Sequence, residues 1–118
     1  MARSRAHRVG WFALAAAIGS ACADDPVAES ACTEAEQAVN WQNWGAGFFA
    51  GYCRSCHSAQ TPDRRGAPVG MDFDTAAGVA LYREAIERSV VDEATMPWGG
   101  GLPSAERAQL QVFLRCSP

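Results

Sequence analysis

The strongest constraint on this chain is the pentapeptide Cys53-Arg54-Ser55-Cys56-His57. Two residues separate the cysteines, so a helical backbone carries both thiols on one side, about one turn apart. A histidine follows directly, and a neutral imidazole is a good metal ligand. The order and the gap cannot change without moving the imidazole relative to the two thiols.

This C-x-x-C-H spacing is the one required for covalent attachment of c-type haem. Each thiol adds to a vinyl group on one porphyrin edge, and the histidine is carried beneath the ring, where its nitrogen binds the iron. We therefore predict one covalent haem c, attached through Cys53 and Cys56, with His57 as an iron ligand.

Three other interpretations of the motif fit less well. A thioredoxin-like redox pair belongs in a βαβ setting, and no strand-like run precedes Cys53. A zinc site needs two further ligands, and the only other histidine, His7, lies in a segment that we expect to be removed. Two cysteines so close in a helix are poorly placed for a disulfide.

Residues 1–23 have the features of a signal peptide. Arginines 3, 5 and 8 precede a short apolar run over 11–18, which is too short to span a bilayer. Small residues ending at Ala23 suit cleavage after that position. A lipoprotein-type signal, cleaved before Cys22 with lipidation of that cysteine, remains open. Both alternatives predict a periplasmic protein, or one on the outer face of a membrane.

Charge limits the partners. The full chain has a net charge of −3, and removal of the three signal arginines makes it −6. This acidic balance, without any lysine, argues against nucleic acid and anionic membrane surfaces as partners. We expect membrane contact only through a lipid on Cys22, and redox proteins as the partners.

Two cysteines remain once the motif and the signal are set aside. Cys32 and Cys116 lie near the two ends of the expected mature chain. In an oxidising compartment they are the natural disulfide pair. The alternatives are that both thiols are free or that Cys22 pairs with one of them.

Apolar periodicity predicts the helices. Residues 24–42 read as an N-terminal leader with at most a short helical turn. Asn43 is the expected N-cap of a helix that leads into the motif, and its aromatic face is expected to be core around the haem. The members of that face are Trp44, Phe48, Phe49, Tyr52 and Cys53.

Two further helices are expected. The first runs from Ala76 to about Val90 behind Asp74 or Thr75 as N-cap, and the last begins behind Ser104. Their apolar positions are Val79, Tyr82, Ile86 and Val90 in the first, and Leu110, Phe113 and Leu114 in the last. The last helix is expected to pack across the helix that leads into the motif.

The loops between these helices offer the second iron ligand. Met96 lies in the Gly/Pro-rich stretch 95–103 and is the preferred thioether; Met71, in the loop 58–72, is the competitor. A carbonyl near Pro68 is expected to accept the other N–H of His57. Arg64 or Arg65 is a candidate partner for a haem propionate, although solvated surface charge is the preferred role for both.

The order of these features resembles a small single-haem cytochrome c domain with His/Met ligation. The resemblance covers residues 44–116, and its specific motifs are Cys53-x-x-Cys56-His57 and Met96-Pro97. It implies an all-α domain of three to four helices over residues 43–118, around one haem with His57 and Met96 as axial ligands. The chain lacks the lysine-rich docking face of some members, and a Cys32–Cys116 bridge is not a general family feature.

The function that we expect is that of a one-electron carrier, not an enzyme, because no nucleophile–base pair is apparent. One alternative is a haem-based sensor that binds a small ligand when the sixth iron ligand leaves. Another is a haem-free, disulfide-bonded surface lipoprotein.

Overall fold

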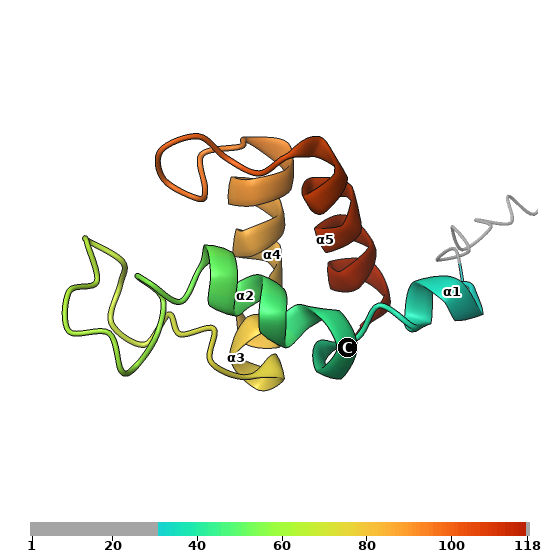
Figure 1. Cartoon of the computed structure of the whole chain (residues 1–118), viewed down its shortest axis with the longest axis horizontal. Coiled ribbons are helices and arrows are strands. Elements are labelled where there is room, and N and C mark those ends of the chain that lie inside the picture. The colour runs from blue at the N-terminus through green and yellow to red at the C-terminus, as the bar shows by residue number, and fades with distance from the viewer. Residues whose placement is uncertain (1–30, 118) are drawn as a thin grey trace, which may run out of the picture.

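A computed structural model describes residues 31–117. Within this range all regular structure is helical and no strand is present, so the all-α class is confirmed for the described part of the chain (Figure 1). The elements, in order, are α1 (Glu34–Gln37), η1 (Trp41–Gly45), α2 (Ala46–Tyr52), α3 (Ala76–Leu81), α4 (Arg83–Ile86), η2 (Glu87–Asp92) and α5 (Ser104–Cys116). The segments η1 and η2 are π-helical turns continuous with α2 and α4.

The helix that leads into the motif begins earlier than expected. Asn40 is the N-cap, and its side chain accepts hydrogen bonds from the amides of Gln42 and Asn43. The Asn43 side chain accepts from the Asn40 amide in return, so the prediction of Asn43 as the cap was wrong. The earlier start brings Trp41 into contact with Phe49, at 5.9 Å between ring centroids. The boundary expected at residue 43 falls inside this helical segment.

The helix expected over 76–90 is present but interrupted. Thr75, one of the two expected caps, accepts from the Gly78 amide at 3.1 Å. Tyr82 leaves helical geometry between α3 and α4, and its hydroxyl donates to the Gly70 carbonyl at 3.1 Å. The expected apolar stripe still faces inward, with Val79, Ile86 and Val90 buried and Tyr82 half-buried.

Helix α5 packs against the helix that leads into the motif, as predicted. The Phe113 ring lies 6.0 Å from the Phe49 ring and 5.6 Å from the Trp44 ring. The expected cap was wrong: Ser104 is already helical, Pro103 occupies the N-cap position, and no side chain caps the first turn. A serine with helical dihedrals cannot cap, because an N-cap residue is usually extended.

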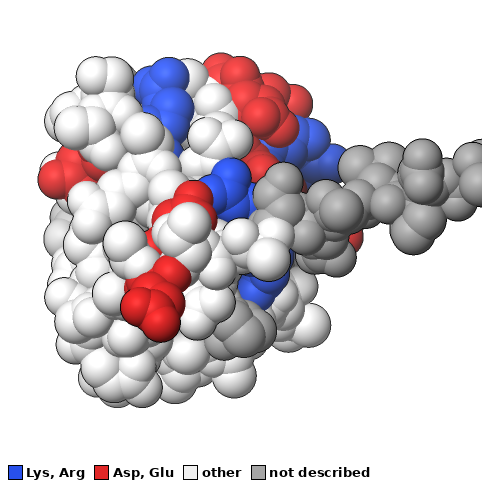
Figure 2. Space-filling view, turned by 90° about the vertical axis from the view of Figure 1, so that its right-hand side faces the viewer, with Lys and Arg blue, Asp and Glu red and all other residues white. Residues whose placement is uncertain are grey.

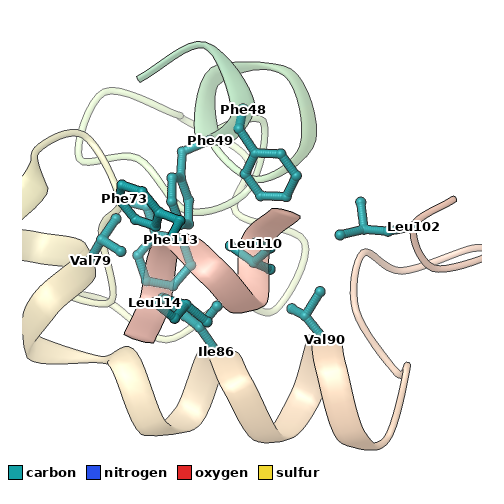
Figure 3. Close-up of a cluster of buried hydrophobic side chains, with 10 residues drawn as sticks. All are labelled: Phe48, Phe49, Phe73, Val79, Ile86, Val90, Leu102, Leu110, Phe113 and Leu114. Carbon is teal, nitrogen blue, oxygen red and sulfur yellow. The ribbon is translucent and has the colours of Figure 1, made fainter. Parts of the chain in front are cut away.

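One core joins these helices (Figure 3). Phe49 and Leu110 are fully buried at its centre. Its buried members are Phe48, Phe49, Phe73, Val79, Ile86, Val90, Leu102, Leu110, Phe113 and Leu114. The predicted core positions of the first and last helices are therefore confirmed, except that Trp44 and Cys53 are half-buried and Tyr52 is 38% exposed.

The two ends of the described chain meet at a disulfide. The sulfurs of Cys32 and Cys116 lie 1.99 Å apart, so the predicted pair is the one found in the structure. Glu36 of α1 pairs with Arg115 of α5 beside it. Figure 2 views this end of the molecule and shows acidic and basic side chains interspersed.

Two other predictions concern the N-terminus and the membrane. The signal peptide, with its possible lipidation site Cys22, lies outside the described residues. Among residues 31–117, no helix combines the length and the apolar character needed to cross a bilayer.

Candidate functional site

The loops 58–72 and 95–103 project at the end of the molecule opposite α1 (Figure 1). Residues of both loops line a cavity of about 630 Å³. This volume is within the usual range for pockets that hold a cofactor. Among the residues that line it are all the predicted haem residues and both candidate thioethers: Cys53, Cys56, His57, Met71 and Met96. The structure therefore brings these five side chains to one hollow.

The motif continues the helix by one turn. The Cys53 amide donates to the Phe49 carbonyl at 3.0 Å, and the His57 amide donates to the Cys53 carbonyl at 2.9 Å. Neither cysteine of the motif forms a disulfide. Burial raises the pKa of the Cys53 thiol to about 12, so the thiol is protonated at neutral pH. A thioredoxin-like pair needs a lowered thiol pKa, so that alternative loses support.

The imidazole of His57 is fixed from two sides. Its Nδ1 lies 3.1 Å from the carbonyl oxygen of Met71, and its ring stacks on Phe73 at 4.6 Å between centroids. A carbonyl only accepts, so Nδ1 carries the proton and Nε2 keeps its lone pair. The orienting carbonyl was expected near Pro68 and instead belongs to Met71. The reason is the backbone bond from the Phe73 amide to the His57 carbonyl, at 2.9 Å, which brings residues 71–73 against the histidine.

Arg64 holds the loop 58–72 together through hydrogen bonds. Its side chain is only 17% exposed, and its guanidinium is hydrogen-bonded to protein groups. Its guanidinium donates through Nη1 to the Ser58 carbonyl (2.7 Å) and Asp72 Oδ1 (2.6 Å), and through Nη2 to the carbonyls of Pro68 (2.7 Å) and Met71 (3.1 Å). The preferred expectation of solvated charge was therefore wrong for Arg64, whereas Arg65 is exposed as expected.

Asp74 binds the motif and the residues just after it through its carboxylate. Its Oδ1 accepts from Arg54 Nε at 2.8 Å and its Oδ2 from the Ala59 amide at 2.9 Å. Hydrogen bonds, led by the one from Ala59, hold the pKa of Asp74 below its usual range. Sequence reasoning considered Asp74 only as a helix cap. No spacing rule connects positions 54 and 74, so the sequence carries no signal for this contact.

The loop that carries Met96 is anchored at one carbonyl. The Ser89 oxygen, in the π-helical turn η2, accepts from the Thr95 amide (2.8 Å), the Thr95 hydroxyl (3.1 Å) and the Met96 amide (3.1 Å). π-Helical turns often occur at functional sites because they alter the local backbone hydrogen bonding. Met96 itself is 39% exposed at the cavity, whereas Met71 is half-buried and packs against the core.

A second hollow, of about 580 Å³, lies beside the disulfide. The sulfurs of Cys32 and Cys116 and the carboxylate of Glu36 come within 4.8 Å of one another there. Because the two sulfurs are bonded to each other, they are not thiolates and do not form a metal site. None of the five haem-related side chains lines this hollow.

Comparison with known proteins found no matching family model, no matching curated protein and no matching solved structure.

Proposed function

We propose that this chain is an extracytoplasmic c-type cytochrome, which binds one haem covalently and carries single electrons between redox-partner proteins. The observation that carries the proposal is the state of His57. Its Nδ1 is hydrogen-bonded to a carbonyl, which in the neutral ring leaves Nε2 as the lone-pair donor, and His57 lines the same cavity as two cysteines that form no disulfide. This is the donor set that covalent haem attachment requires.

The cavity wall suits a flat apolar ring. Besides the thiols and the imidazole, it includes buried apolar side chains: Phe48, Phe73, Ile86, Val90, Leu102 and Leu110. Cys53 and Cys56 would hold the haem, and His57 and Met96 would bind its iron. The bound group would supply an iron that cycles between ferrous and ferric states, and the chain would keep water from it.

The backbone favours Met96 over Met71 as the second axial ligand. The Met71 carbonyl accepts a hydrogen bond from His57 Nδ1, so the main chain of Met71 lies on the same side of the site as the histidine. A second iron ligand would have to come from a segment other than the one that holds the His57 ring. Met96 enters the cavity from a different loop, anchored at Ser89, and is free of this constraint.

The carrier role and the location have separate support. His57 is the only histidine among the described residues, and in the proposal it is an iron ligand, so no second imidazole is at hand there as a general base. The Cys32–Cys116 disulfide fits an oxidising compartment outside the cytoplasm, as the proposed export requires.

One observation favours a second candidate, a haem-based sensor of small ligands. Met96 is partly exposed, and the loop that carries it continues into three glycines at positive φ, Gly99 to Gly101. Such a loop has little side-chain packing to hold it. A thioether that leaves easily would open the sixth position of the iron.

Visible spectroscopy with carbon monoxide discriminates between the two candidates. A carrier predicts a low-spin spectrum in both oxidation states and a ferrous form that does not bind carbon monoxide at neutral pH. A high-spin ferric spectrum with rapid, tight binding of carbon monoxide would favour the sensor. The protein is purified from a host that matures c-type cytochromes.

A further inference from the structure

We propose that Arg64 is a positioning residue that raises the reduction potential of the site, by sharing with His57 the carbonyl of Met71. The inference rests on the proposed function, because it requires an iron bound at His57. It assigns to Arg64 a role other than surface charge or propionate binding.

The contact is a three-centre arrangement at one oxygen. The Met71 carbonyl accepts from His57 Nδ1 at 3.1 Å and from Arg64 Nη2 at 3.1 Å. A carbonyl oxygen has two lone pairs, so it can accept from both donors at once. The other hydrogen bonds of Arg64 hold its guanidinium in this position, and they go to Ser58, Ala67, Pro68 and Asp72.

The charged donor weakens the carbonyl as a partner for the imidazole. A guanidinium draws electron density toward itself more strongly than a neutral donor does. The Nδ1–H of His57 is then polarised less, and its ring donates less electron density to a metal at Nε2. Because the ferric state needs that donation more, Arg64 favours the ferrous state, and hydrogen bonding to axial ligands is an established means of tuning potential.

Asp72 opposes this effect. Its carboxylate lies 2.6 Å from Arg64 Nη1 and offsets part of the positive charge beside the Met71 carbonyl. Removing the arginine therefore lowers the potential, and removing the carboxylate raises it. A loop that had merely loosened would move the potential in the same direction in both variants, so opposite signs identify the electrostatic mechanism.

The test compares midpoint potentials of the haem-bound protein and three variants. For Arg64→Gln we expect the ferrous-to-ferric ratio at a fixed applied potential to fall about tenfold, which is about 59 mV for one electron. For Asp72→Asn we expect a smaller change of opposite sign. Arg65→Gln removes the same charge from the adjacent, exposed position and is expected to change the ratio less than twofold.

A second readout is the His57 Nδ1 proton resonance in the ferrous protein. It should move downfield in Arg64→Gln, because the bond to Met71 strengthens, and stay in place in Arg65→Gln. If Arg64→Gln does not fold, Asp72→Asn carries the test, because it leaves Arg64 in place and must raise the potential.

The outcomes separate the inference from the function on which it rests. Wild-type protein without haem overturns both. Haem-bound protein in which the Arg64 and Asp72 variants shift the potential in the same direction, or no further than Arg65→Gln, overturns the role of Arg64 alone.

Discussion

At the scale of single residues, Met71 contributes to the site through its backbone carbonyl. Sequence analysis regarded it as a competing thioether, but its carbonyl is the group that matters, because it fixes which nitrogen of His57 is protonated. Met96 is then the thioether without another role. Replacing each methionine by alanine is therefore expected to give a different result.

For Met96→Ala we expect the sixth iron position to open, because the side chain that fills it is gone. The potential should fall, and the ferrous protein should bind carbon monoxide. Met71→Ala keeps its backbone carbonyl, so its absorption spectrum should match that of the wild type. Absorption spectra of the two variants with and without carbon monoxide make the comparison. The reverse pattern would show that Met71 is the ligand.

Asp74→Asn is expected to change how stability depends on pH. The pKa of Asp74 is lowered by the hydrogen bonds of the folded protein, led by that from Ala59. Its contribution is therefore fully present above the ordinary aspartate pKa of about 3.9, and is lost as pH falls from there through the folded value. Wild type should lose more stability than the variant between about pH 5 and pH 3.

Denaturant unfolding at pH 7, 5 and 3 measures this difference. Glu36 also has a lowered pKa, caused mainly by the Thr33 amide, but it is common to both proteins and cancels in the comparison. Parallel pH profiles would contradict a stabilising role for the Asp74 carboxylate.

At the scale of elements, η1 packs closely on α5. A Cβ on Gly45 would lie 2.8 Å from Phe113 Cε2 and 2.9 Å from its Cζ. That ring is 3% exposed and bordered by other aromatic rings. We expect Gly45→Ala to destabilise the fold by about 1–3 kcal/mol through overpacking.

Gly47→Ala is the matched control on the same helical segment. A Cβ there meets nothing within 4 Å. Because alanine is the better helix former, we expect this change to stabilise by about 0.5–1 kcal/mol. Chemical denaturation measures both variants, and equal effects of the two would refute the close packing of η1 on α5.

The helices themselves follow from the sequence, but their ends do not. Apolar spacing located the segments around Phe49, Ile86 and Leu110, because a buried helical face must repeat every three to four residues. The start of η1 differed because two asparagines compete there. Asn40 prevails over Asn43 through a reciprocal pair of hydrogen bonds and the Trp41 contact, which local sequence does not reveal.

The sequence likewise predicts only some residues of the candidate site. The motif predicted Cys53, Cys56 and His57, because attachment chemistry fixes their spacing. The residues that hold the motif in place, Arg64 and Asp74, depend on how the loop 58–72 folds back. Such contacts join positions with no periodic relation, so a single sequence does not predict them.

At the scale of the whole molecule, the cavity and the disulfide are formed by different residues. The two projecting loops and α1 lie at opposite ends (Figure 1). Residues of the loops line the cavity, and the disulfide joins Cys32, just before α1, to Cys116 at the end of α5. This separation implies that the disulfide stabilises the fold without contributing to the site.

Replacing both Cys32 and Cys116 by serine tests that division. The bridge closes a loop with a sequence separation of 84. The chain-entropy estimate for such a loop is about 4–5 kcal/mol, an upper guide to the stability lost. Denaturant unfolding should show a loss of that order, with the visible spectrum unchanged. A loss below about 1 kcal/mol, or an altered spectrum, would contradict the division.

The most direct test of the account is the intact mass of the exported protein, purified from a host that matures c-type cytochromes and weighed after denaturation. Covalent attachment predicts the mass of the processed chain plus one haem, since addition of the thiols to the vinyl groups loses no atoms. Replacing Cys53 and Cys56 by alanine should abolish the increment. A wild-type mass equal to that of the polypeptide alone would contradict the account.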